Sequence, residues 1–312
     1  MRCGAALLAL LLSGGCAVPA PEAAPDNKSS KPEPAPAPLA RGFVPFVWPR
    51  AGVITRMTCR FETARPIGVF AASAAPEEAT ALARVLRAFE TGGLGVRFID
   101  APLEDAQIHV AFGVEPLALG ARSVSDCKLT DEHAELAAAR VEVARSVALR
   151  RGATRALARE ELLGVLAREL ARALGYAGEA PARDPIGSRS LAEAKRVGAA
   201  LRDGAALDSP ALRALYARAS GSLVGSVAAE PPSATRPVDR LAQLAQTHRL
   251  DGPYLRTSAD SARVYWRDAA SGEEYGAQVL EPARLERAPA RIALALEPRA
   301  RRALPRSRDA PR

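Results

Sequence analysis

The sequence predicts an α+β fold, in which a mixed twisted sheet packs against amphipathic helices. Two segments carry apolar residues at the spacing of one helix face, residues 76–91 and 158–174. Residues 94–99 and 107–112 lie between them and are rich in β-branched and apolar residues, which is typical of strands. The chain has 312 residues, 48% of them hydrophobic and 25% charged, so it is long enough to bury a sizeable core.

Residues 1–15 predict export. Arg2 precedes an apolar stretch and then small residues, which is the layout of a secretory signal. Cys16 follows directly, and the site resembles a bacterial lipobox, in which this cysteine is lipidated, although Ser13 stands where that motif prefers leucine. An ordinary signal cut after Ala20 is the alternative. We therefore expect an exported protein of the cell envelope, membrane-anchored through Cys16 or secreted.

Residues 16–41 are predicted to be a proline-rich linker. Seven prolines lie between Pro19 and Pro38. This composition favours extended, polyproline-like conformations, so the segment suits a spacer between a membrane surface and a folded domain. The same composition fits a disordered tail of a secreted protein.

The folded part begins with a predicted domain at residues 42–219. Residues 53–61 and 67–70 have the pattern of short strands. A helix is expected to begin at Pro76, because proline and the acidic residues after it suit the first helical turn, and to end at Gly92. The further elements expected in this domain are a polar connection at residues 123–135, a strand at 140–143, the helix at 158–174 ended by Gly175, a loop at 180–190 and a helix at 209–216.

Residues 220–298 are expected to form a small C-terminal α+β region. The pattern predicts a helix at residues 238–247, a turn at 251–253, and a hairpin that joins 262–266 to 274–280. The role of this region does not follow from the sequence.

Residues 299–312 are expected to be a basic, disordered tail. The last 30 residues contain nine arginines and three acidic residues, which accounts for most of the net charge of +8. The rest of the chain is nearly balanced, so nucleic-acid binding is not indicated. Weak adhesion of the tail to anionic lipid headgroups or to polysaccharide is an alternative role.

Cys59 and Cys127 are the only cysteines of the predicted folded part. Two such cysteines in an exported protein most often pair, so we expect a disulfide bond that stabilises the fold by about 4 kcal/mol. Two unpaired buried thiols are the alternative.

Residues 161–176 resemble the active-site helix of matrixin-like metalloproteases of the metzincin clan. That family has the pattern L-x-x-V-x-x-H-E-x-x-H-x-x-G-x-x-H, in which three histidines bind zinc and the glutamate is the general base. The glutamate and glycine remain here as Glu169 and Gly175, whereas Arg168, Arg172 and Gly178 stand at the three histidine positions. The resemblance extends over about residues 42–219 and implies a metzincin-like domain.

The changed positions predict that the zinc site is lost and that no cofactor is bound. Arginine stays protonated and offers no lone pair to a metal ion. The resemblance therefore implies a pseudoprotease with a vestigial Glu169, in which Arg168 and Arg172 attract an acidic group of a bound peptide or protein segment, and in which an exposed edge strand pairs with that segment.

Three other interpretations of the same helix stay open. The first is an active zinc endopeptidase with atypical ligands, to which His109 or His133 could contribute. The second is a structural module of the cell envelope with no cleft function. The third is an amphipathic surface helix, on which Glu169 and Arg172 form a weak i,i+3 pair.

Overall fold

The structure is a computed structural model of the chain. It describes residues 38–39, 46–50, 53–129, 133–149, 152–176, 178, 180–181, 183–228, 236–258, 261–280 and 293–304. The predicted signal, Cys16, nearly all of the predicted linker, and residues 305–312 lie outside these ranges. Of the helices within them, none combines the length and the apolar character that a membrane span requires.

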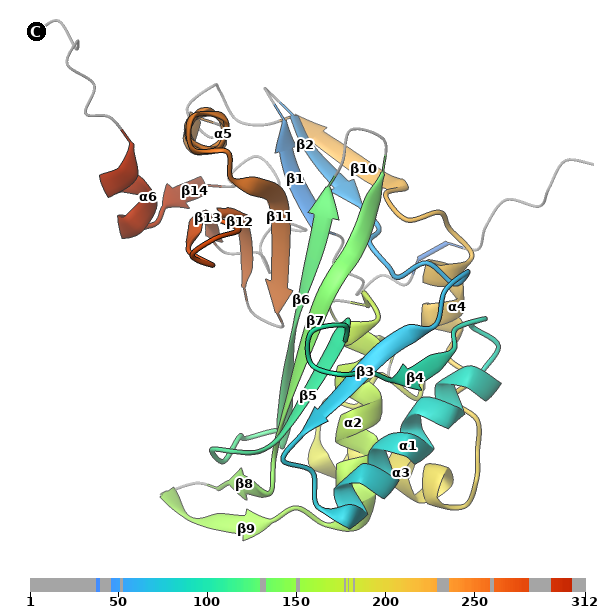
Figure 1. The fold of residues 1–312 in the computed structure, drawn as a ribbon. Coiled ribbons are helices and arrows are strands. Elements are labelled where there is room, and N and C mark those ends of the chain that lie inside the picture. Colours follow the sequence, from blue (N-terminus) through green and yellow to red (C-terminus); the bar gives the residue numbers. More distant parts are fainter. Residues whose placement is uncertain are drawn as a thin grey trace, which may run out of the picture. The chain divides into compact units, whose positions relative to one another are not determined.

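The described ranges contain six helices and fourteen strands (Figure 1). The helices are α1 (Pro76–Thr91), α2 (Arg159–Ala173), α3 (Leu191–Arg202), α4 (Pro210–Tyr216), α5 (Arg236–His248) and α6 (Pro298–Ala303). The strands are β1 (Phe46–Arg50), β2 (Val53–Met57), β3 (Ile67–Ala72), β4 (Phe98–Asp100), β5 (Ile108–Val114), β6 (Ala121–Leu129), β7 (Ala134–Ala144), β8 (Ser146–Ala148), β9 (Thr154–Ala156), β10 (Leu223–Ala228), β11 (Asp251–Ser258), β12 (Ala262–Arg267), β13 (Glu274–Leu280) and β14 (Ala293–Leu296).

A nine-stranded mixed sheet organises the fold, in the order β14-β13-β12-β11-β6-β7-β5-β3-β4. Strands β4, β3, β5 and β7 run parallel to one another, and every pairing from β7 through β6 to β14 is antiparallel. Strands β1, β2 and β10 form a separate three-stranded sheet, and β8 pairs with β9. The predicted α+β class and the mixed sheet are therefore confirmed.

Helix α2 contacts β6 and β7 of the sheet and packs closely against α3 (Figure 1). Glycines make this close approach of the two helices possible. A Cβ atom on Gly164 of α2 would lie 1.9 Å from the backbone oxygen of Ala194, and one on Gly198 of α3 would lie 1.7 Å from that of Glu160. Since neither separation is sterically allowed, any larger residue would push the helices apart.

The predicted polar connection at residues 123–135 is instead a hairpin of two long strands, β6 and β7. Alternate residues of β6 are buried, and they include Ser123, Ser125 and Cys127 as well as apolar side chains. Because small polar residues occupy part of the buried face, the alternation of apolar and polar residues that indicates a strand is weak in this segment.

The expected disulfide bond between Cys59 and Cys127 is confirmed. It joins the segment after β2 to the C-terminal half of β6, over a Cα–Cα distance of 6.1 Å. Both cysteines are fully buried in the main core.

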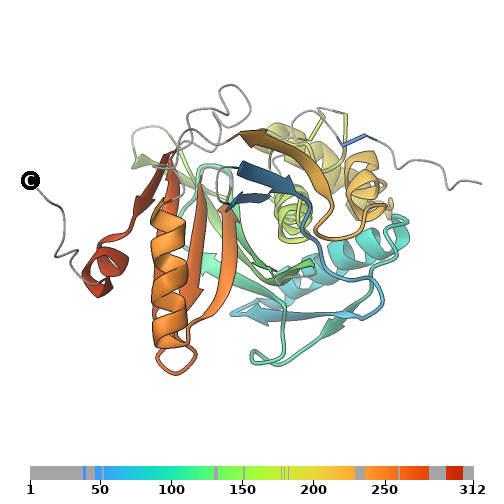
Figure 2. The same cartoon turned by 90° about the horizontal axis from the view of Figure 1, so that it is seen from above.

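The C-terminal region extends the main sheet. Strand β11 pairs antiparallel with β6, from Tyr254 opposite Lys128 to Ser258 opposite Val124. Helix α5 packs against the strands of this region (Figure 2). Because β6 has β11 on one side and β7 on the other, it is an interior strand, and β4 and β14 are the edge strands of this sheet.

Part of the predicted disordered tail is helical instead. Residues 299–303 belong to helix α6, which contacts β13. Ala300 and Leu304 are buried, so burial of small apolar side chains orders this stretch despite its arginines.

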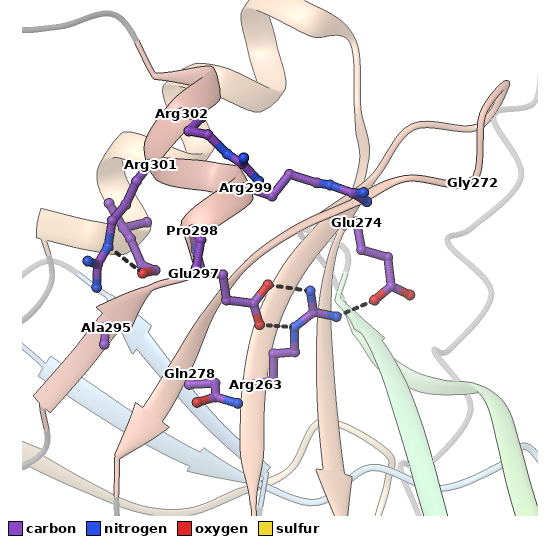
Figure 3. Close-up of a pocket in the computed structure, with 11 residues that line it drawn as sticks. Arg263, Gly272, Glu274, Gln278, Ala295, Glu297, Pro298, Arg299, Arg301 and Arg302 are labelled. Carbon is purple, nitrogen blue, oxygen red and sulfur yellow. Dashed lines mark hydrogen bonds and ion pairs between the residues drawn. The ribbon is translucent and has the colours of Figure 1, made fainter.

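A ladder of alternating acidic and basic side chains crosses the C-terminal strands. Arg256 on β11 donates two hydrogen bonds to Asp126 on β6, at 2.6 and 3.0 Å, and two to Glu274 on β13, at 2.9 and 3.0 Å. Arg263 on β12 also contacts Glu274 and donates two bonds to Glu297, at 2.5 and 2.6 Å (Figure 3). The ladder therefore connects the C-terminal region to β6 through side chains as well as backbone.

Acid is expected to weaken this ladder at Glu274. Burial raises the pKa of Glu274, but hydrogen bonds and charges from Arg256 and Arg263 outweigh it and leave the pKa below its ordinary value of 4.5. A carboxyl group with a lowered folded-state pKa contributes stability above its unfolded pKa, and this contribution disappears as the pH falls through the folded value. The free energy of unfolding should therefore fall as the pH drops below 4.5.

The variant Glu274→Gln is the check. Urea unfolding at neutral pH should show a loss of about 1.5–3 kcal/mol, because two arginines lose a charged acceptor. Between neutral and acid pH, the free energy of unfolding of this variant should fall by less than that of the unchanged chain. An equal loss between neutral and acid pH in both proteins would contradict the role of Glu274.

Candidate functional site

The candidate site is centred on α2, the helix that carries Arg168, Glu169 and Arg172. Glu161 fixes the start of this helix, since its carboxylate accepts a 3.0 Å hydrogen bond from the backbone NH of Ala158 and two 2.7 Å bonds from Arg155. These bonds from Arg155 hold the pKa of Glu161 below its ordinary value. Most of α2 beyond this turn is buried, which is consistent with a helix in the core and not with an amphipathic surface helix.

Glu169 lies at the centre of a fully internal hydrogen-bond network. Its side chain is 0% exposed. One carboxylate oxygen, Oε1, accepts hydrogen bonds from Nε of Arg168 and Nη1 of Arg172, both at 2.7 Å. The other oxygen, Oε2, accepts one from the hydroxyl of Ser123 on β6, also at 2.7 Å. We call Arg168, Glu169, Arg172 and Ser123 the Glu169 cluster.

Arg168 faces the protein interior. Its side chain is 2% exposed, and its Nη2 donates a 3.0 Å hydrogen bond to the backbone oxygen of Leu119. Its Nη1 is buried and has no partner within the described ranges. Among the described residues, Glu169 is the acidic side chain that pairs with this guanidinium group, and at 2% exposure the group is out of reach of an external acidic partner.

Arg172 is the more accessible arginine, with 24% of its side chain exposed. The turn of helix that carries it is attached to the sheet, because its backbone oxygen accepts a 3.1 Å hydrogen bond from the Ser125 hydroxyl. Of the two arginines predicted to bind an acidic partner, only Arg172 lies where a partner could touch it. Arg168 lies in the interior, where its guanidinium group pairs with the Glu169 carboxylate.

The arrangement leaves Glu169 unsuited to general-base catalysis. A general base needs a water or substrate proton within hydrogen-bond reach. Here three donors occupy the carboxylate, two of them cationic, and no part of the side chain touches solvent. The chemistry that this geometry supports is charge neutralisation inside the core.

Gly175 has a geometric reason to be glycine. Its φ is +101°, and a Cβ atom there would lie 2.1 Å from the backbone oxygen of Cys59. The chain leaves α2 at this point, as expected from the C-terminal glycine signal. Gly178, at the position of the third family histidine, has a φ of +97° and offers no side chain.

The other residues considered for a metal site are spread over the fold. His109 on β5 lies with Nε2 2.9 Å from the backbone oxygen of Ala106, and His133 is exposed just before β7. Within the described ranges, no three His, Cys, Asp or Glu side chains gather in a way that could hold a metal ion.

Sequence reasoning missed two serines that bond to α2, Ser123 of the Glu169 cluster and the neighbouring Ser125. Ser123 and Ser125 are two positions apart on β6 and so face the same side of the sheet, toward α2. The alternation of small residues along 121–129 was the available signal, but it was interpreted as a polar connection.

The comparisons with known proteins give no assignment: no protein-family model matches this chain, and neither does any curated protein.

Proposed function

We propose that this protein is a non-hydrolytic module with a matrixin-like fold, in which an internal arginine–glutamate cluster takes the place of a zinc centre. It serves as a binding or structural module of the cell envelope. The observation that carries the proposal is the environment of Glu169, whose carboxylate is fully buried and bonded to Arg168, Arg172 and Ser123.

Electrostatics supports this assignment. A unit positive charge about 4 Å from a divalent ion opposes its binding by roughly 8 kcal/mol at an effective dielectric constant of about 20. Two guanidinium groups lie within hydrogen-bond distance of Glu169, so a cation placed against this carboxylate would meet both. Neither arginine can act as a metal ligand.

The position of β11 limits how a peptide partner could bind. Strand β11 already makes the antiparallel pairing with β6 that an added peptide strand would make. The proposal therefore assigns contact with an acidic partner segment to the exposed part of Arg172, and not to strand addition on β6.

Export and membrane attachment belong to the same proposal. They rest on the pattern of residues 1–15 and on Cys16. A buried disulfide bond in the folded part is compatible with an oxidising compartment outside the cytoplasm.

Metal analysis with a protease assay tests the proposal. The purified full chain is equilibrated with zinc, passed into zinc-free buffer, analysed by elemental mass spectrometry, and assayed on a mixed fluorogenic peptide library with and without a chelator. We expect substoichiometric zinc and no chelator-sensitive hydrolysis. One tightly held zinc per chain, with hydrolysis that Glu169→Gln abolishes, would instead establish a zinc endopeptidase with atypical ligands.

A further inference from the structure

Strand β14, at one end of the main sheet, has an edge without a partner strand in the described ranges. Strand β13 pairs with it on one side, and β14 ends the strand order (Figure 1). Its four residues are alanines and leucines, with no charged residue and no proline among them. Natural sheets often use such residues to block an exposed edge, so the backbone of this edge is open to a further strand.

The strand register shows which backbone groups of β14 face outward. The NH group of Glu297, directly after β14, donates a 3.0 Å hydrogen bond to the backbone oxygen of Gly276 on β13. Residues of an antiparallel pair alternate in direction, so Ala295 also bonds toward β13, whereas the NH and carbonyl groups of Leu294 and Leu296 point away from it. These outward groups are the template that an added strand needs.

Arg301 of α6 lies at this edge. Its Nε donates a 2.7 Å hydrogen bond to the backbone oxygen of Leu296, one of the outward groups (Figure 3). This bond holds the guanidinium group beside the path of an added strand. Arg301 and the exposed Arg302 form no ion pair with another described residue. Both arginines are therefore available to carboxylates of a partner.

A groove of about 800 Å³ adjoins the edge. Ala295 and Leu296 of β14 line it, together with the arginines of α6. The two glutamates of the lining, Glu274 and Glu297, both pair with Arg263, which also lines the groove. The arginines of α6 therefore leave the lining with a positive balance of charge, which favours an acidic occupant.

The opposite edge of the main sheet, at β4, is protected. The NH group of Phe98 donates a 2.8 Å hydrogen bond to the carboxylate of Glu90, and β4 has only three residues. Asp100 and Glu104 are exposed beside it and would repel an acidic strand. Of the two edges of this sheet, β14 is the one that combines open backbone groups with positive charge.

We propose that β14 binds an extended acidic peptide segment of a partner protein by strand addition. The backbone of the segment pairs with Leu294 and Leu296, and its acidic side chains lie against Arg301 and Arg302. This site is separate from Arg172, so the proposal goes beyond the function proposed above and does not depend on it.

Fluorescence anisotropy of the purified full chain tests this with three labelled hexapeptides. The first alternates valine and glutamate, the second alternates valine and lysine, and the third is the first with every backbone nitrogen methylated. The lysine peptide should bind about tenfold more weakly than the glutamate peptide, because it meets the arginines with like charge. The methylated peptide should also bind about tenfold more weakly, since it cannot donate backbone hydrogen bonds to β14.

Variants locate the site. Leu294→Pro removes one outward NH group and leaves the bonds to β13 in place, so it should weaken binding of the glutamate peptide about fivefold. Leu294→Ala keeps that NH group and is the matched control. Arg301→Gln should also weaken binding about fivefold, whereas Arg87→Gln, on an exposed part of α1, should leave it unchanged. Circular dichroism verifies the fold of each variant.

Hydrogen exchange of the unchanged chain gives a check that needs no variant. With the glutamate peptide bound, the NH groups of Leu294 and Leu296 should exchange more slowly, and that of Ile99 on β4 should not change. The proposal is overturned if the glutamate peptide does not bind at millimolar concentration, or if the lysine or methylated peptide binds equally well. It is also overturned if the chain sediments as a dimer that Leu294→Pro dissociates, because a second copy would then occupy this edge.

Discussion

Replacing Glu169 by glutamine is expected to lower the free energy of unfolding by about 3–5 kcal/mol. The substitution keeps the size of the side chain but removes the charge that balances Arg168, which is 2% exposed and cannot turn to solvent. An uncompensated buried charge is among the costliest single changes in a protein. Urea unfolding followed by tryptophan fluorescence measures the loss.

The matched control is Glu62→Gln, on an exposed glutamate that lies outside the cluster. It should change stability by less than about 0.5 kcal/mol. If Glu169 were instead a solvated base in a working active site, its replacement by glutamine would leave stability nearly unchanged. Equal, small effects of the two substitutions would therefore contradict the internal role of Glu169.

Loss of the Cys59–Cys127 bond is expected to destabilise the fold by about 4 kcal/mol. The bond closes a long loop, with a sequence separation of 68 residues between its cysteines, so the unfolded chain gains much freedom without it. The measurement is the free energy of unfolding of the oxidised and the reduced chain under otherwise identical conditions.

The variant with both cysteines replaced by alanine provides the control for reduction. Reductant should shift the unfolding curve of the unchanged chain and leave that of this variant in place. A reductant effect that persists in the variant would show that the shift does not come from the Cys59–Cys127 bond.

Local signals were sufficient where one face of an element is clearly apolar. Helix α1 spans Pro76–Thr91, as proline, acidic residues and Gly92 predicted. Helix α2 spans Arg159–Ala173, within one residue of the predicted ends. The hairpin of β12 and β13 also appears where its alternating residues placed it. In these segments, the residues that decide the local conformation are also the ones that pack.

Local signals failed where small residues form the packing face. Helix α3 was not predicted, because its buried residues are Ala194, Gly198 and Leu201 in a segment that is rich in alanine all round. Helix α3 packs against Gly164 of α2. A close contact between two segments that lie far apart in the sequence leaves no periodic apolar pattern in either segment.

The candidate site was predicted in part. The spacing of Arg168, Glu169 and Arg172 placed a carboxylate between two guanidinium groups on one helix. The helix alone could not show that the Arg168 side chain points into the core. The partners of this side chain include the backbone oxygen of Leu119, which is 49 residues away in the chain. Contacts of that kind depend on the tertiary fold, as does the pairing of β11 with β6.

A double-mutant cycle on Arg168 and Glu169 tests the central claim most directly. The free energies of unfolding are measured for Arg168→Met, Glu169→Gln, the double variant and the unchanged chain. If the two side chains exist to neutralise each other in the core, the double variant should lose about 2 kcal/mol less than the sum of the single losses. Losses that add within about 0.5 kcal/mol would contradict the account.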